Sequence, residues 1–168
     1  SGINYDVRKD VPYLFYNEVD FKVPLYSEGD CLARYFVRAD ELRESSKIIY
    51  QVFEKMPKGD VLLNSPKKVL PRKVEIYTKM EELIHDFMIV NFGINPPEGE
   101  IYSAVENPKG ELGFYIVSKG EGHPWKLKIR SPSFVNIQSI PKLVEGEMIS
   151  DVVAIIGSID PVMGEADK

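Results

Sequence analysis

The C-terminal stretch carries acidic residues directly after an apolar run. Asp160 and Glu165 follow the segment Val152–Ile156, which is entirely apolar. A carboxylate next to a buried element is costly unless partners neutralise or hydrogen-bond it. The pattern alone favours a solvated tail, because chain termini are usually mobile, and a built acidic loop is the alternative.

Neither histidine has the neighbours that a metal site needs. A two-histidine zinc helix needs a second histidine four residues away, and residues 81 and 89, on either side of His85, are Glu and Ile. His123 lies in a glycine-bounded turn and is interpreted in the same way. Cys31 is the only cysteine, so the chain cannot supply the thiolates of an iron–sulfur cluster or a structural zinc. We therefore predict no metal ligands.

Groups that could act in catalysis are equally sparse. Glu106 and Glu111 flank a predicted hairpin, where carboxylates are usually solvated or paired with lysines. Cys31 near a helix start could have a lowered thiol pKa, but a free cysteine beside Leu32 is more often a small buried hydrophobe. The sequence contains no nucleophile elbow, phosphate-binding loop or dinucleotide fingerprint. We predict no catalytic residue and no NADH site in this chain.

Composition sets the broad class. The 168 residues are 43% hydrophobic, which is enough for one sizeable core. A net charge of −5 argues against non-specific nucleic-acid binding, which needs clustered lysines and arginines. No run approaches the roughly 20 apolar residues that span a bilayer, and the polar start has no signal-peptide pattern. We expect a peripheral or soluble globular chain, and the single cysteine suits a reducing compartment.

Two amphipathic helices are predicted to follow an irregular, tyrosine-rich segment of residues 1–26. Ser27 and Asp30 resemble a capping box that opens a helix over residues 30–56, with apolar residues at intervals of three and four and a stop at Pro57. A second amphipathic helix is predicted over residues 73–92, with Gly93 as its C-cap. The first segment needs a neighbour to cover its aromatic rings.

The period then changes to that of strands. Residues 100–106, 112–118 and 125–130 predict a small three-stranded antiparallel meander, and its third strand should have one apolar and one basic face. Ser133 should cap a short helix that Pro141 interrupts or ends, and Ser150 should cap a last, deeply buried helix over residues 152–156. The predicted fold class is α+β, with residues 1–168 forming a single domain.

Four strings in order resemble the 49-kilodalton, or D, subunit family of respiratory complex I. Each string is weak evidence, but the ordered set is specific. Residues 1–9 and 80–85 are similar to further family segments. The strings span residues 29–38, 108–113, 128–134 and 157–165. The resemblance covers the whole chain and corresponds to roughly the C-terminal two fifths of a family member.

The resemblance implies a fold like that of nickel–iron hydrogenase large subunits, with long helices, the small meander and buried C-terminal helices. The family's terminal loop lines the quinone cavity beside the terminal iron–sulfur cluster of a neighbouring subunit. The residues matching that loop are Asp160, Val162, Met163, Gly164 and Glu165. Val162 and Glu165 stand where the related hydrogenases have the cysteine pair that ligates nickel. Arg34 and Arg130 are expected to form structural ion pairs.

The implied function is that of a subunit that helps to form the quinone site of NADH-quinone oxidoreductase, an enzyme coupled to proton translocation. The chain itself would bind no cofactor and would be inactive alone. Quinone and the other peripheral-arm subunits would be its partners, on the cytoplasmic side of the inner membrane. The family's quinone-headgroup histidine and tyrosine lie outside this sequence, so neither His85 nor Tyr102 receives those roles.

Two alternatives differ in what they require. A catalytic hydrogenase subunit needs paired cysteines, and the single Cys31 argues strongly against it. A structural or assembly module of a related membrane-bound hydrogenase-like or plastoquinone-linked complex needs no functional loop, and the sequence leaves it open.

Overall fold

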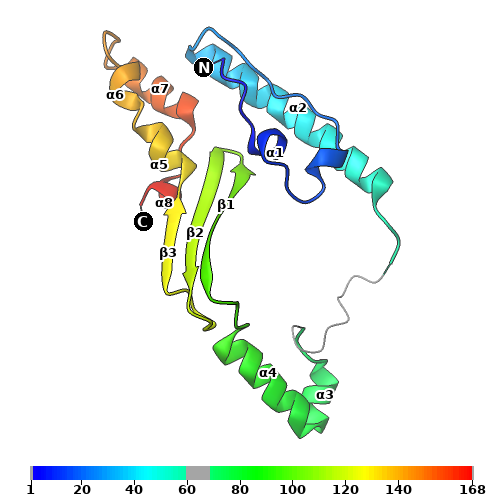
Figure 1. Cartoon of the computed structure of the whole chain (residues 1–168). Coiled ribbons are helices and arrows are strands. Elements are labelled where there is room, and N and C mark those ends of the chain that lie inside the picture. The colour runs from blue at the N-terminus through cyan, green and yellow to red at the C-terminus, as the bar shows by residue number, and fades with distance from the viewer. Residues whose placement is uncertain (1, 60–68, 168) are drawn as a thin grey trace. The chain divides into compact units, whose positions relative to one another are not determined.

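The computed structural model describes residues 2–59 and 69–167 and combines helices with one antiparallel three-stranded sheet (Figure 1). The prediction of the α+β class is confirmed. In chain order the elements are α1 (Val7–Asp10), the 3-10 helix η1 (Tyr16–Glu18), α2 (Cys31–Lys55), α3 (Lys73–Thr78), α4 (Met80–Phe92), β1 (Gly99–Asn107), β2 (Gly110–Ser118), β3 (Lys126–Arg130), α5 (Pro132–Ile137), α6 (Ile140–Leu143), α7 (Asp151–Ile159) and α8 (Met163–Ala166).

Contacts divide the chain into two compact units. The first contains residues 1–56, 104–113 and 129–168, and the second contains residues 57–103 and 114–128. The single-domain assignment of residues 1–168 stays a prediction. In the first unit the buried apolar side chains are those of Val7, Val19, Phe21, Ala33 and Ile155.

The long helix α2 agrees with the predicted range of 30–56 to within one residue at each end. Its N-cap, however, is Asp30, whose carboxylate accepts a hydrogen bond from the backbone N–H of Ala33 at 2.7 Å. The capping role that we expected for Ser27 is therefore wrong. Asp30 has the extended backbone that an N-cap requires, and its short side chain reaches the free N–H three residues on.

The N-terminal segment packs against α2. Gln51 receives a hydrogen bond from the N–H of Asp20 at 2.9 Å and donates one to the carbonyl of Asp20 at 2.7 Å. Tyr26 donates to Asp40 at 3.0 Å, further towards the start of the helix. Residues 20–26 thus run alongside α2 in the opposite direction (Figure 1).

The helix predicted over residues 73–92 is broken at Lys79. This residue has extended dihedral angles, so α3 ends at Thr78 and α4 begins at Met80. The hydroxyl of Thr78 donates back to the carbonyl of Val74 at 2.8 Å, a contact that often accompanies helix bends. Gly93 is the C-cap at φ 69°, as predicted.

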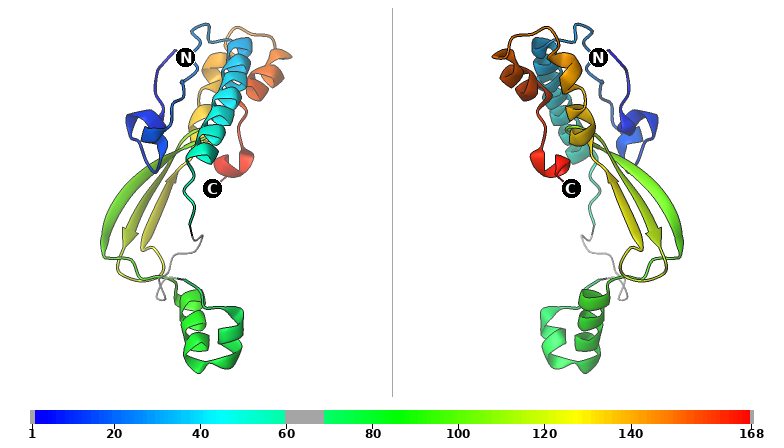
Figure 2. Two further views of the ribbon diagram at one scale, coloured as in Figure 1. Left: turned by 90° about the vertical axis from the view of Figure 1, so that its right-hand side faces the viewer. Right: turned by 90° about the vertical axis from the view of Figure 1, so that its left-hand side faces the viewer.

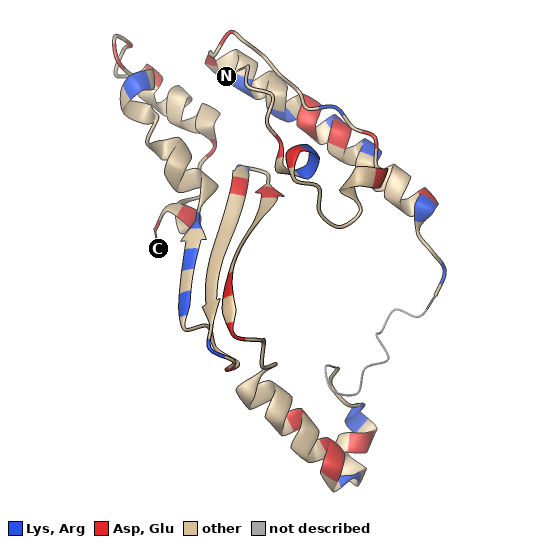
Figure 3. Cartoon of the chain, in the orientation of Figure 1, with Lys and Arg blue, Asp and Glu red and all other residues tan. Residues whose placement is uncertain are grey.

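The meander has the predicted order β1-β2-β3. A two-residue turn, Pro108–Lys109, joins β1 to β2, and the side chain of Asn107 accepts a hydrogen bond from the N–H of Lys109 at 3.3 Å. Every residue of β3 is exposed, and its lysines form a basic stripe (Figure 3). This turn between β1 and β2 carries Lys109, a residue of the candidate site described below.

The C-terminal helices depart from prediction in two ways. Ser131, not Ser133, occupies the N-cap position of α5, while Pro141 lies in the first turn of a separate helix, α6. The expectation of deep burial for the last helix is also wrong. Helix α7 packs mainly against α2 and α6 (Figure 2), and it buries Ile155 but leaves Val153 77% exposed.

Candidate functional site

The terminal segment, residues 160–165, starts at a sharp change of backbone direction. Helix α7 ends at Ile159, and its C-cap, Asp160, adopts the left-handed conformation with φ 54° and ψ 55°. Its N–H still donates to the carbonyl of Ile156 at 3.2 Å, which closes the last turn. Aspartate tolerates this conformation better than most residues other than glycine. The chain therefore leaves the helix axis at Asp160 and enters a short turn.

Two cations hold the side chain of Asp160. The Nζ amine of Lys109 donates to its carboxylate, and Nε of Arg38 lies 4.0 Å from the same oxygen. The hydrogen bond from Lys109 is the main reason that the pKa of Asp160 lies below its usual value. Lys109 is itself fixed, because its carbonyl accepts a hydrogen bond from Asn136 at 2.9 Å. The turn between β1 and β2 is thereby tied to the end of α7.

Arg34 and Arg38 lie one turn apart on α2 and both reach Ser158. The Nε of Arg34 donates to the hydroxyl of Ser158 at 2.9 Å, and Arg38 donates to its carbonyl oxygen. The last carbonyl groups of a helix lack partners within the helix, and the helix dipole favours positive charge there. The two arginines therefore stabilise the end of α7, from which the terminal segment departs.

The far end of the segment is held by Glu165. Its Oε2 accepts hydrogen bonds from the hydroxyl of Ser133 at 2.6 Å and from the N–H of Ser133 at 3.4 Å. Its Oε1 accepts one from Asn107 at 3.3 Å. The hydroxyl oxygen of Ser133 in turn accepts from the N–H of Val162 at 3.1 Å. Both ends of the Val162–Glu165 turn are thus fixed to the buried start of α5.

The apolar residues of the turn remain uncovered. Val162 is 42% exposed and Met163 is 67% exposed. A Cβ atom added at Gly164 would meet nothing within 4 Å. The carboxylates are used for anchoring, whereas the apolar side chains are presented outwards. This arrangement suits contact with an apolar ring or another protein surface.

The five predicted loop residues all lie in the terminal segment, whereas the two predicted arginines lie outside it, on other parts of the chain. Arg34 bonds to Ser158 and also donates to the carbonyl of Gly29 at 2.7 Å. Arg130 donates to the carbonyl of Glu111 at 2.6 Å. Their roles as ion-pair partners stay predictions, as does the lining of a quinone cavity by Asp160, Val162, Met163, Gly164 and Glu165.

Four residues that anchor the end of α7 or the Val162–Glu165 turn had no predicted role in the site: Arg38, Asn107, Lys109 and Ser133. For Arg38, the signal was available in its spacing of four residues from Arg34 on one helix. For Lys109, it was the position at the tip of a two-residue turn that follows Asn107. Nothing in the sequence indicated that Ser133 would contact the terminal segment.

The carboxylates at the first hairpin contact the N-terminal segment. Glu106 accepts a hydrogen bond from the N–H of Val7 at 3.1 Å, and Tyr5 donates to Glu111 at 3.0 Å. Burial raises the pKa of Glu106, and the hydrogen bond from Val7 partly offsets this effect. These contacts attach the N-terminal segment to β1 and β2.

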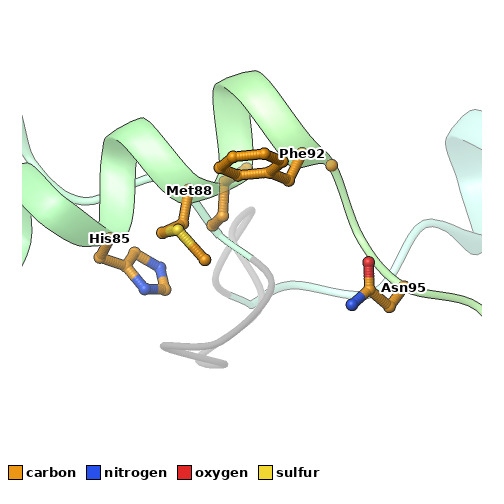
Figure 4. Close-up of a pocket in the computed structure, with 6 residues that line it drawn as sticks. His85, Met88, Phe92 and Asn95 are labelled. Carbon is orange, nitrogen blue, oxygen red and sulfur yellow. The ribbon is translucent and has the colours of Figure 1, made fainter. Parts of the chain in front are cut away.

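His85 lies in the second unit. Its Nε2 is 3.4 Å from the carbonyl of Val69, and its ring helps to line an open pocket of about 240 Å³ with Met88, Phe92 and Asn95 (Figure 4). Across residues 2–59 and 69–167, no group of three or more His, Cys, Asp or Glu side chains is arranged to hold a metal. In the same residues no helix is long and apolar enough to cross a membrane.

Comparisons with known proteins agree over the whole chain. The family model for the 49 kDa subunit of respiratory-chain NADH dehydrogenase matches residues 1–168. The NADH-quinone oxidoreductase D subunit (D 1) of Chloroherpeton thalassium is 62% identical over 168 residues, covering 100% of this chain and 38% of the relative. The D subunit of Salinibacter ruber is 53% identical over 169 residues, covering 100% and 38%, and that of Methylacidiphilum infernorum is 54% identical over 168 residues, covering 100% and 40%. The chain spans about two fifths of the length of these curated relatives.

Proposed function

This chain belongs to the family of the 49 kDa subunit of respiratory-chain NADH dehydrogenase, and from that premise we propose that its terminal segment forms part of the quinone-reducing site of an NADH-quinone oxidoreductase. The observation that carries the proposal is that the acidic side chains of the terminal segment are bonded, whereas its apolar side chains are exposed. Asp160 and Glu165 are bonded to the chain's own residues, while Val162 and Met163 are exposed.

The exposed apolar side chains are the groups that would contact the quinone. A quinone ring is apolar and planar, so exposed branched and thioether side chains are suitable contacts for it. The anchored carboxylates hold the turn in one conformation, which spares the entropy of ordering it when the quinone binds. The residues of this chain position the quinone, and they supply neither electrons nor a covalent intermediate.

The electron donor would be an iron–sulfur cluster in a neighbouring subunit. Cys31 is the only cysteine in the chain, and four thiolates are the usual ligand set of such a cluster. We propose that the other peripheral-arm subunits are the partners, and that the assembly lies peripherally on the cytoplasmic side of the membrane and couples quinone reduction to proton translocation. The isolated chain would reduce no quinone.

The test is quinone reduction by the assembled complex carrying Val162→Ala or Met163→Ala. Loss of apolar contact should raise the KM for quinone by roughly four- to fifteenfold, because each buried methylene contributes about 0.8 kcal/mol and Val162→Ala removes the equivalent of two. Val153→Ala is the matched control, since Val153 is also an exposed valine but lies on α7. Assembly is checked by the yield of purified complex.

The competing function is a structural or assembly role. If Val162→Ala and Met163→Ala leave the quinone KM and inhibitor sensitivity unchanged in a normally assembled complex, the turn does not contact quinone. A fall in the yield of complex with unchanged kinetics would indicate the assembly role instead.

A further inference from the structure

Ser133 is fully buried and is bonded to both ends of the terminal turn. Its hydroxyl donates to Glu165 at 2.6 Å and accepts from the N–H of Val162 at 3.1 Å. We propose that Ser133 is a positioning residue, a latch that fixes the Val162–Glu165 turn and thereby sets its affinity for quinone. The effect on quinone rests on the function proposed above, whereas the latch itself does not.

The hydroxyl of Ser133 both donates and accepts. A serine hydroxyl has one proton to donate and lone pairs to accept, and here the proton goes to Glu165 while an oxygen lone pair receives the N–H of Val162. The two contacts are separated by the three peptide bonds between Val162 and Glu165. One small side chain therefore closes the turn into a ring, which a hydrophobic side chain of similar size could not do.

The backbone of Ser133 adds a second contact to the same carboxylate. Helix α5 has no side-chain hydrogen bond at its N-cap, and Pro132 has no N–H to offer. The N–H of Ser133 is among the first free donors of the helix, and it points to Oε2 of Glu165 at 3.4 Å. Glu165 thus caps α5 from a position 32 residues further along the chain.

Ser131 provides a close comparison within the same stretch of chain. It is also buried, with 4% of its surface exposed against 0% for Ser133. In the part of the chain that the structure describes, its hydroxyl has no hydrogen-bond partner. Ser131→Ala and Ser133→Ala therefore remove the same atom from neighbouring buried positions, and only the second removes the contacts to the turn.

The experiment measures amide hydrogen exchange of residues 162–165 in the assembled complex. With Ser133→Ala, exchange at Val162 should become faster by on the order of three- to tenfold, as expected for the loss of one or two hydrogen bonds. Ser131→Ala should leave it unchanged. Equal exchange in the wild type and Ser133→Ala overturns the latch, and so does equal acceleration by both variants.

A double-variant cycle shows whether Ser133 acts through Glu165. In a Glu165→Ala background the latch predicts that adding Ser133→Ala accelerates exchange at Val162 less than it does in the wild type, because the two residues form one network. Full additivity overturns the coupling. A matching rise in the quinone KM, with kcat changing less, is expected if the turn binds quinone. Faster exchange with an unchanged KM would uphold the latch and overturn its effect on quinone affinity, whereas the proposed function itself fails only if Val162→Ala and Met163→Ala also leave the KM unchanged.

Discussion

The amine of Lys109 donates to the carboxylate of Asp160, joining the turn between β1 and β2 to the end of α7. The two residues are 51 positions apart in the chain. Because Asp160 is the residue at which the terminal segment turns away from the helix, this contact fixes the direction in which the segment leaves. The terminal segment is thus anchored, at Asp160, to the turn between β1 and β2.

Removing the amine should change how the protein responds to acid. Lys109 holds the pKa of Asp160 below its ordinary value of 3.8. A carboxyl group whose pKa is depressed in the folded state stabilises it above the unfolded pKa, and that contribution is lost as the pH falls through the folded pKa. Lys109→Met should therefore reduce stability slightly at neutral pH and make no difference at a pH below both values.

The measurement is the Tm of the chain between about pH 2.5 and 7, a range that spans the titration of the carboxyl groups. Lys126→Met is the control, because it removes the same charge from an exposed position on β3. The effect should be small, because the Asp160 side chain is 51% exposed and solvent screens such pairs. A difference between Lys109→Met and wild type that grows as the pH falls towards the acid end would contradict the assignment.

Glu106 should show the opposite sign. Its pKa is raised above 4.5, chiefly by burial. A carboxyl group with a raised folded pKa favours the folded state most below its unfolded pKa, and this advantage disappears as the pH rises through the folded pKa. Glu106→Gln keeps an oxygen that can accept from Val7 and removes the buried charge. It should therefore raise the Tm at neutral pH relative to wild type and have little effect at a pH below 4.5.

Glu121→Gln, at an exposed position between β2 and β3, is the control for the change in net charge. Equal shifts in Tm for the two variants at neutral pH would mean that net charge, and not burial of Glu106, is responsible.

Gly164→Ala separates the fold from the site. The added Cβ meets nothing within the chain, and alanine is favoured over glycine in a helix by about 0.5–1 kcal/mol. The Tm of the chain should be unchanged or slightly raised. In the assembled complex the new methyl group lies on the exposed turn, so we expect the quinone KM or inhibitor sensitivity to change several-fold.

Gly157→Ala on α7 makes the same substitution where there is also open space. If both variants leave quinone kinetics at the wild-type value, Gly164 does not face bound quinone. If both variants alter quinone kinetics equally, the effect comes from replacing a helical glycine in general and not from the position of Gly164 in the turn.

Much of the local structure follows from the sequence. Helical spacing and Pro57 define α2 to within a residue, alternation and turn residues give the three strands in order, and Gly93 marks the end of α4. These features are predictable because each depends on residues within a few positions of one another. The break at Lys79 was missed, since no proline or glycine marks it.

The partners of the terminal segment were decided only by the tertiary structure. The sequence predicts Ser133 as a helix cap because serine is common at that position, yet its hydroxyl bonds to residues 29 and 32 positions away. Arg38 and Lys109 contact Ser158 and Asp160 across still larger separations, 120 and 51 positions. The sequence by itself determined most of the elements and the family, because local chemistry and ordered motifs carry that information. Which polar groups meet depends on the path of the whole chain, which no local period encodes.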